Sequence, residues 1–434
     1  MRNFTKHALQ AIAIGSLFTL GACAPENTGR VVSVEAPQNA IDKDHLKRID
    51  AVLQKEVDEG VRAGFVAAVV TRDGVAYQTA VGEADPFNDT PMTLDTRFRF
   101  ASMTKPIISV AVMQLVDRGI INLNDPAGLY IDSYNDARVA TSRDLNSDGE
   151  FETRPASRPI TVHDLLTHMA GIGYGFTQNT DLEKAYFDAN LFNTDGTLCE
   201  RIDQIAAVPL LQDPGTKWDY SYSIDVLGCL IEVATGTPLD QYLSENIFEP
   251  LGMTETEFFM DEADLEDLAL VIEFDENGEM VRSGGTDLAQ GINDVPFGVM
   301  SGGAGLLSNV HDYTRFMRML LNYGTLDGTR ILSPQTVRLM TSDHTPEETR
   351  PPYWLASGTS FGLGGSVVLE PGYTGEVAAA GDWGWAGYWD TWFSINTELG
   401  VGYITLSQAQ PNPYIKPSRA RFGVKAIAYS ALED

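Results

Sequence analysis

The stretch that most constrains this 434-residue chain is residues 98–119, FRFASMTKPIISVAVMQLVDRG. Apolar side chains recur at helical spacing after Ser102, which predicts a helix that begins near this serine and buries one face. Positions three apart share a helical face, so Lys105 is expected beside the Ser102 hydroxyl. A crowded lysine can activate a hydroxyl as a nucleophile. The same pattern also fits an N-cap serine followed by a solvated lysine, so the motif alone does not decide.

The rest of the chain places this helix in an alternating pattern. Residues 45–60 carry apolar side chains at helical spacing, and two β-rich runs then meet at the turn Arg72-Asp73-Gly74. A hairpin that leads into a helix indicates a sheet packed on that helix. Helical patterns dominate residues 120–285, and strands alternate with helices again from residue 286. Residues 120–285 are therefore interpreted as a helical insertion.

Charge excludes some classes of partner. The chain has 60 acidic and 30 basic residues and a net charge of −30, with the acidic residues spread along its length. Such a surface repels nucleic acid and anionic lipid. We expect no nucleic-acid partner, and the sequence does not indicate an oligomeric state.

The first residues carry a targeting pattern. A basic start, an apolar run and Leu20-Gly21-Ala22 precede Cys23, so residues 1–22 are expected to be a secretory signal. The cysteine after small residues resembles a bacterial lipobox, in which Cys23 becomes the lipidated first residue. Ala24, by the same resemblance, favours the periplasmic face of the outer membrane. Residues 23–40 then form a tether; a plain signal peptide cut elsewhere is the alternative.

Two aromatic stretches add candidate chemistry. KWDYSYSIDVLG places Tyr220 before a helix, where a phenol near a lysine can move a proton between a serine and a leaving group. GDWGWAGYWDTWFS combines glycine and tryptophan on a predicted strand, which is typical of close backbone approach to another group. Aromatic packing explains either stretch equally well when it is considered alone.

Taken in order, five stretches resemble the serine β-lactamase and penicillin-binding superfamily. The likeness is greatest to class C β-lactamases and to the family VIII carboxylesterases built on the same fold. The stretches are SMTK, ITVHDLLTHMAGI, WDYSYSIDVLG, SGGAGLLSNVHDYTRF and WAG. The resemblance implies a β-lactamase-like α/β fold. Residues 41–119 and 286–434 would form an antiparallel sheet flanked by helices, with the mainly helical domain 120–285 inserted and the site between them.

The resemblance also implies the reacting residues. Ser102 matches the acylated nucleophile, Lys105 its activating partner, and Tyr220 the proton shuttle of acylation and deacylation. The backbone N–H groups of Ser102 and Tyr388 would form the oxyanion hole. The triplet Trp385, Ala386 and Gly387 stands where lactamases have Lys-Thr-Gly, and is expected to bind substrate. No cofactor and no metal are implied.

Two departures from the lactamase pattern bear on the substrate. Tyr222 stands at the position of an asparagine that helps to hold a substrate amide, and Trp385 replaces the lysine that meets a lactam carboxylate. A neutral aromatic side chain cannot supply that charge pairing. We therefore expect a serine hydrolase that acts through an acyl-enzyme, most simply a carboxylesterase that cleaves neutral, short-chain esters. A class C-like β-lactamase, a D-amino-acid peptidase and a non-catalytic cell-wall or acyl-ligand binding protein remain alternatives.

A second serine motif is interpreted as a decoy. Residues 358–362, Gly-Thr-Ser-Phe-Gly, match the nucleophile elbow of α/β-hydrolases. That fold needs a helix after the serine and a later histidine, whereas a glycine-rich strand pattern follows here and every histidine precedes Ser360. Ser360 is therefore predicted to be a turn residue.

Two further patterns stay open. The acidic stretch 144–152 matches part of a calcium-binding EF-hand loop, but Pro155 occupies the position of the bidentate glutamate, which favours a solvated acidic loop. Cys199 and Cys229 could pair in an oxidising compartment, or Cys229 could be a buried free thiol in a helix.

Overall fold

The computed structural model describes residues 40–189, 196–286, 289–290, 300–350, 356–411 and 416–433. They belong to one unit, Gln38–Asp434. The predicted signal peptide, Cys23 and the tether up to residue 39 lie outside the described residues. Among the helices of the described part of the chain, none has the length and apolar character needed to cross a bilayer.

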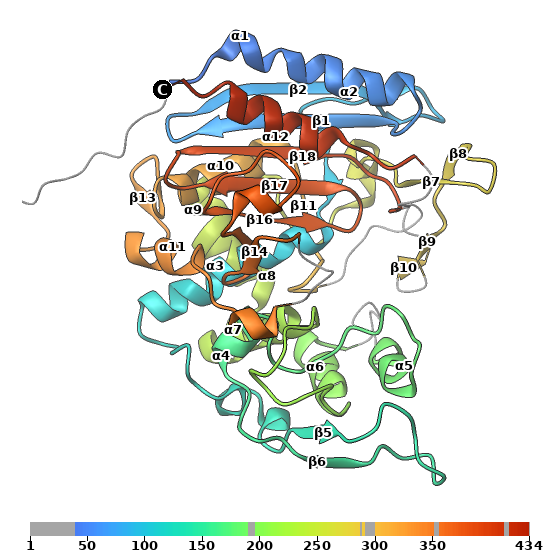
Figure 1. Cartoon of the computed structure of the whole chain (residues 1–434), viewed down its shortest axis with the longest axis vertical. Coiled ribbons are helices and arrows are strands. Elements are labelled where there is room, and N and C mark those ends of the chain that lie inside the picture. Colours follow the sequence, from blue (N-terminus) through green and yellow to red (C-terminus); the bar gives the residue numbers. More distant parts are fainter. Residues whose placement is uncertain are drawn as a thin grey trace, which may run out of the picture. The chain divides into compact units, whose positions relative to one another are not determined.

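The main sheet has eight antiparallel strands that come from both ends of the sequence. Figure 1 shows the N-terminal and C-terminal strands side by side. The strand order is β14-β15-β16-β17-β18-β1-β2-β3, and β1 pairs with both β2 and β18. This confirms the antiparallel sheet implied by the resemblance. The strands are β1 Gly64–Thr71, β2 Val75–Asp85, β3 Thr90–Pro91, β14 Thr359–Phe361, β15 Ser366–Val368, β16 Asp382–Gly387, β17 Thr391–Asn396 and β18 Val401–Leu406.

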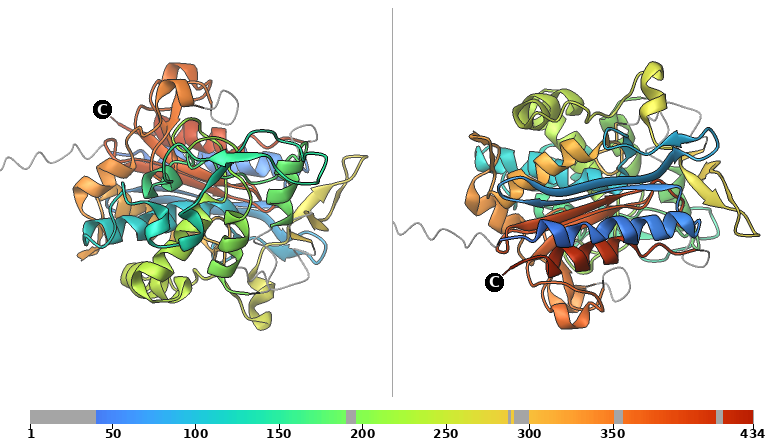
Figure 2. Two further views of the ribbon diagram at one scale, coloured as in Figure 1. Left: turned by 90° about the horizontal axis from the view of Figure 1, so that it is seen from below. Right: turned by 90° about the horizontal axis from the view of Figure 1, so that it is seen from above.

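Strand β1 is apolar throughout because both faces of the sheet are covered. Successive side chains point to opposite faces, so Phe65 and Val69 pack into one core and Val66 and Val70 into the other. The first core lies under the terminal helices, which Figure 2 shows side by side on one face of the sheet. These helices are α1 Lys43–Leu46, α2 Arg48–Asp58 and α12 Ala420–Ser430.

The second core carries the predicted central helix. Helix α3 is buried at every residue from Thr104 to Leu115, so the helix is buried on all sides rather than on one face. Helix α10 packs against β1 and β18 on the same side of the sheet, and α3 packs against α7. The helices on this side are α3 Thr104–Asp117, α10 Val310–Leu321 and α11 Pro334–Met340.

Between α3 and α10, the described residues of 120–286 include more helical than strand residues, joined by long loops (green to yellow in Figure 1). A disulfide joins Cys199 on α6 to Cys229 on α7, which resolves the open question about these cysteines. The helices are α4 Val162–Leu166, α5 Asp181–Asp188, α6 Leu198–Ala206, α7 Ser223–Thr235, α8 Leu239–Leu243 and α9 Glu249–Leu251, with a π-helical turn η4 at Ser244–Phe248.

Short ribbons and turns complete the described chain. The ribbons are β4 Phe98–Arg99 with β11 Leu307–Ser308, β5 Arg138–Ala140 with β6 Thr153–Pro155, β7 Ile272–Phe274 with β8 Met280–Arg282, β9 Gly285–Thr286 with β10 Ala289–Gln290, and β12 Thr325–Leu326 with β13 Thr329–Arg330. The 3-10 turns are η1 Ala101–Met103, η2 Ala127–Leu129, η3 Asp132–Tyr134, η5 Glu262–Asp267, η6 Glu347–Thr349 and η7 Pro371–Tyr373.

The structure corrects the prediction for Ser360, which lies in strand β14 and not in a turn. Its side chain is buried, and its Oγ is hydrogen-bonded to Asp343 and accepts a bond of 2.9 Å from Arg350 Nε. A serine held in this way inside a sheet has a structural role.

The acidic stretch 144–152 forms the loop between β5 and β6. Within it, Asn146 Oδ1 accepts the backbone N–H groups of Asp148 at 2.9 Å and Glu150 at 3.0 Å, so this oxygen folds the loop. In the parts of the chain that the structure describes, no three or more His, Cys, Asp or Glu side chains are grouped to hold a metal ion.

Candidate active site

Ser102 lies in a tight turn between a strand and a helix. Strand β4 leads into η1, which holds Ser102, and α3 begins two residues later at Thr104. Ala101 has a φ of 44°, in the left-handed region that non-glycine residues rarely adopt. Such backbone strain persists only where surrounding contacts enforce it, and it clusters at functional sites. Here it occurs immediately before the predicted nucleophile.

Lys105 is fully buried and points at Ser102. Its Nζ donates to Ser102 Oγ at 3.1 Å and to the carbonyl oxygen of Gly303 at 2.7 Å. The same nitrogen lies 4.7 Å from the ring centroid of Tyr220 and 5.6 Å from that of Tyr174. The structure therefore joins Ser102 and Lys105 as the three-residue spacing predicted, and excludes the solvated lysine.

Tyr220 lies beside Lys105 and is hydrogen-bonded to Trp385. Trp385 on β16 donates its Nε1–H to Tyr220 Oη at 3.2 Å. His168 packs 4.7 Å from the Tyr220 ring, centroid to centroid, and its carbonyl accepts the N–H of Asp219 at 3.0 Å. These contacts fix the phenol beside the lysine, although Tyr220 and Trp385 are far apart in the sequence.

His168 itself is fully buried, and its Nδ1 lies 3.1 Å from Ser221 Oγ. Burial, and then the positive charge of Lys105, hold the pKa of His168 well below its ordinary value. A neutral imidazole therefore supports the Tyr220 ring.

The end of β16 lies against the Ser102 turn. A side chain at Gly387 would collide with the Phe100 carbonyl, so only glycine allows this approach. Thr391 Oγ1 donates to the same carbonyl at 3.3 Å. This contact brings Tyr388 to the cavity wall beside Ser102. The predicted oxyanion hole, from the N–H groups of Ser102 and Tyr388, requires such an approach and stays a prediction.

A cavity of about 930 Å³ opens over these residues. Ser102 and Tyr220 line it, as does the predicted triplet Trp385, Ala386 and Gly387. Its wall is strongly aromatic and includes Tyr174, Phe176, Tyr220, Trp385, Trp389 and Trp392. A cavity of this kind takes an apolar ligand whose orientation is set by a few polar groups.

The structure corrects the prediction for Tyr222 as a substrate contact. Tyr222 is fully buried and does not line the cavity, because the ring of Tyr174 stacks on it with centroids 4.2 Å apart. Tyr174 faces the cavity instead, and burial raises its pKa well above the ordinary value. Sequence reasoning missed Tyr174; its place in the aromatic segment GYGF, directly after the THMAGI motif, was the available indication.

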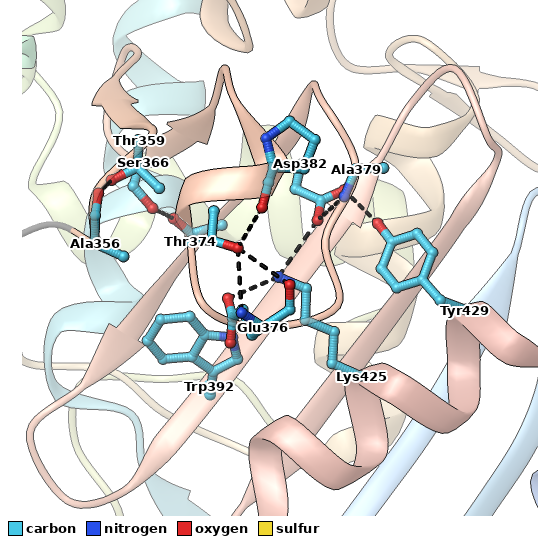
Figure 3. Close-up of polar contacts among 12 residues, drawn as sticks. Ala356, Thr359, Ser366, Thr374, Glu376, Ala379, Asp382, Trp392, Lys425 and Tyr429 are labelled. Carbon is cyan, nitrogen blue, oxygen red and sulfur yellow. Dashed lines mark hydrogen bonds and ion pairs between the residues drawn. The ribbon is translucent and has the colours of Figure 1, made fainter.

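The far wall of the cavity is polar. Lys425 on α12 reaches Glu376 at 2.9 Å and Asp382 at 3.4 Å, and Tyr429 is hydrogen-bonded to Asp382, as Figure 3 shows. The Lys425 ammonium thus holds the loop between β15 and β16 against the last helix. Sequence reasoning did not identify these residues, since no local motif links them.

The chain is similar to known proteins over most of its length. A family model described as Beta-lactamase matches residues 49–426. The chain belongs to this family. The Beta-lactamase match spans the sheet, the inserted region and every residue of the site described above except Tyr429.

Relatives of this Beta-lactamase family member include a named esterase. Protein Rv1367c of Mycobacterium tuberculosis is 32% identical over 387 residues, which cover 87% of this chain and 94% of the relative. Esterase EstB of Burkholderia gladioli is 29% identical over 379 residues, which cover 83% of this chain and 89% of the relative. Among solved structures, EstCE1, described as a hydrolase with promiscuous acyltransferase activity, matches with a TM-score of 0.74 at 25% identity and covers 89% of this chain and 99% of its own.

These findings confirm the β-lactamase-like fold and the expected superfamily. They support hydrolase activity for a member of a serine hydrolase family whose relatives include esterases.

Proposed function

We propose that the protein is a carboxylesterase that cleaves short-chain esters through an acyl-enzyme on Ser102. The observation that carries this proposal is the 3.1 Å hydrogen bond from Lys105 Nζ to Ser102 Oγ at the wall of an aromatic cavity. The name of the relative Esterase EstB supports the same substrate class.

The proposed acylation step uses three side chains. Ser102 Oγ attacks the ester carbonyl carbon while its proton moves to Lys105 Nζ, which reacts as the neutral amine and becomes an ammonium. The carbonyl oxygen gains a negative charge and accepts hydrogen bonds from the N–H groups of Ser102 and Tyr388, each contributing on the order of 3 kcal/mol. Tyr220, beside the lysine, relays a proton to the departing alkoxide, so an alcohol leaves and the acyl group stays on Ser102. Deacylation repeats these transfers with water as the nucleophile, and releases a carboxylic acid and free Ser102.

The environment of Trp385 supports neutral esters over anionic lactams. Its indole N–H donates to Tyr220 Oη at 3.2 Å, at the position where lactamases present a lysine. An indole cannot pair with a lactam carboxylate as an ammonium does. Tyr174, Phe176 and Trp389 extend the aromatic wall, which favours an apolar acyl or alcohol group.

Hydrolysis of a short-chain aryl ester, measured beside a chromogenic cephalosporin, tests the proposal. We expect fast ester turnover and little cephalosporin turnover, with both abolished in folded Ser102→Ala. Cephalosporin turnover of equal efficiency would reassign the protein as a β-lactamase. Unchanged esterase activity in Ser102→Ala would remove Ser102 from the mechanism. A wild type that neither turns over substrate nor reacts with an active-site serine probe would identify a binding protein.

We also propose that the protein is exported and held at the periplasmic face of the outer membrane by lipid on Cys23. The basic start, the apolar run and the small residues before this cysteine support the proposal. Its substrate is then a small ester that reaches the periplasm.

A further inference from the structure

A buried carboxylate lies behind the catalytic lysine. Asp225 is in the first turn of α7, which begins three residues after Tyr220, and its side chain is fully buried. One carboxylate oxygen, Oδ1, accepts from Ser301 Oγ at 2.5 Å and from the backbone N–H of Gly303 at 2.8 Å. An ionised side chain so deep in a protein needs partners of this kind.

Gly303 connects this carboxylate to the lysine. The residue that gives its N–H to Asp225 gives its carbonyl oxygen to Lys105 Nζ at 2.7 Å. A side chain at Gly303 would collide with Asp225 Oδ2, so the close approach depends on glycine. Asp225 therefore positions Gly303, whose carbonyl oxygen accepts the hydrogen bond that orients Lys105.

The two opposite charges also interact. Burial raises the pKa of Asp225 above its ordinary value, and the charge of Lys105 and the bonds from Ser301 and Gly303 offset this rise only in part. Other ionisable groups face this pair from the surrounding elements. They are Tyr134, His168, Tyr174, Arg201, Tyr220 and Tyr222. Among these groups, Arg201 is a cation on α6, and its pKa is raised by the Asp225 charge and lowered more strongly by burial.

We propose that Asp225 is the positioning residue of the Ser102–Lys105 pair. Its carboxylate fixes Gly303, and its charge stabilises the ammonium that forms when Lys105 takes the Ser102 proton. The inference rests on the proposed function, in which that proton transfer starts acylation. A buried carboxylate that orients a base and stabilises its protonated form has the role of the aspartate in a Ser-His-Asp triad.

Asp225→Asn removes the charge and keeps an oxygen for Ser301 and Gly303, while Ser301→Ala keeps the charge and removes one hydrogen bond. At a pH above the acid limb of both proteins, we expect kcat/KM of Asp225→Asn to fall roughly 100-fold, mainly through kcat, because the ammonium that forms loses its counter-charge. Ser301→Ala is expected to lose only about fivefold, the effect of one hydrogen bond.

The pH profile separates an electrostatic role from a merely structural one. In Asp225→Asn the acid limb of kcat/KM is expected to move to lower pH, because the protonated lysine is less stabilised. In Ser301→Ala the limb is expected to stay in place. Thermal unfolding verifies that both variants are folded. A folded Asp225→Asn with wild-type kcat/KM, or with an unmoved acid limb, would overturn the inference.

Phosphonylation of Ser102 by a fluorophosphonate probe separates this inference from the choice of substrate. If the wild type cleaves no ester, the proposed function fails, yet slower labelling of Asp225→Asn would still support the positioning role. Equal labelling of the two proteins would contradict it, and an unreactive wild type would overturn both proposals. Should Asp225→Asn not fold, Gly303→Ala displaces the carbonyl from Lys105, and unchanged labelling of that variant would also overturn the inference.

Discussion

At the scale of single residues, His168 couples the site to the pH dependence of the fold. It is fully buried beside Tyr220, and it adopts a φ of 55°. Burial holds its pKa well below the ordinary value, so the folded protein keeps the imidazole neutral where an unfolded chain would protonate it. The free energy of unfolding is therefore expected to fall as the pH is lowered.

His168→Asn tests this coupling, since asparagine tolerates a positive φ and does not titrate. A histidine with a lowered folded pKa stabilises the fold fully above its unfolded pKa, and that stability is lost as pH falls. Below about pH 6.5 the wild type should lose about 1.4 kcal/mol per pH unit more than the variant. Urea unfolding at pH 7.5 and 5.5 measures the loss of unfolding free energy in each protein. His163 is present in both proteins, so its titration does not contribute to the difference between them. Parallel losses in the two proteins would contradict the prediction.

At the scale of elements, α12 is attached to the sheet by charge as well as by its apolar face. Lys425 is 3% exposed, and it contacts Glu376 in the loop before β16 and Asp382 at the start of that strand. Asp382 is buried too, and it accepts from Asn396 Nδ2 at 2.9 Å. One ammonium thus connects the last helix, the loop and the strand that carries Trp385.

Lys425→Met keeps the length of the side chain and removes its charge. The buried Asp382 would lose its cation, and we expect the free energy of unfolding to fall by about 3 kcal/mol. Glu376→Gln is the matched control, because Lys425 keeps Asp382 and the partly exposed Glu376 contributes about 1 kcal/mol or less. Urea denaturation compares the two variants, and equal losses would show that the buried carboxylate is not the dominant partner.

At the scale of the whole molecule, both chain ends contribute strands to one sheet, and residues 120–286 are inserted between them. The reactive group draws on both parts, since Ser102 and Trp385 belong to the sheet portion and Tyr220 to the insertion. The proposed anchor at Cys23 precedes this unit in the sequence.

Cys23→Ser tests the anchor in a bacterial host. We expect the wild type to incorporate labelled palmitate and to fractionate with the outer membrane, and the variant to do neither. Ser102→Ala is the control, because it alters the site and leaves the lipobox intact. Wild-type protein that is exported without lipid would contradict the anchor and favour a plain signal peptide.

Local spacing determined much that could be predicted from the sequence. Ser102 and Lys105 are three residues apart, so their contact at 3.1 Å follows from one turn of backbone. The hairpin of β1 and β2 follows from its turn residues for the same reason. The order of motifs along the chain was sufficient to predict the superfamily.

Contacts between distant segments were decided only by the tertiary structure. Tyr174 rather than Tyr222 faces the cavity because two aromatic segments stack, and their stacking order has no local pattern. Asp225 reaches Gly303 across 78 positions of sequence, and Lys425 meets Glu376 through the docking of α12. Sequence alone determined what neighbouring residues can do within one element. Packing decided which elements meet, because burial and charge pairing depend on the whole core and not on a single motif.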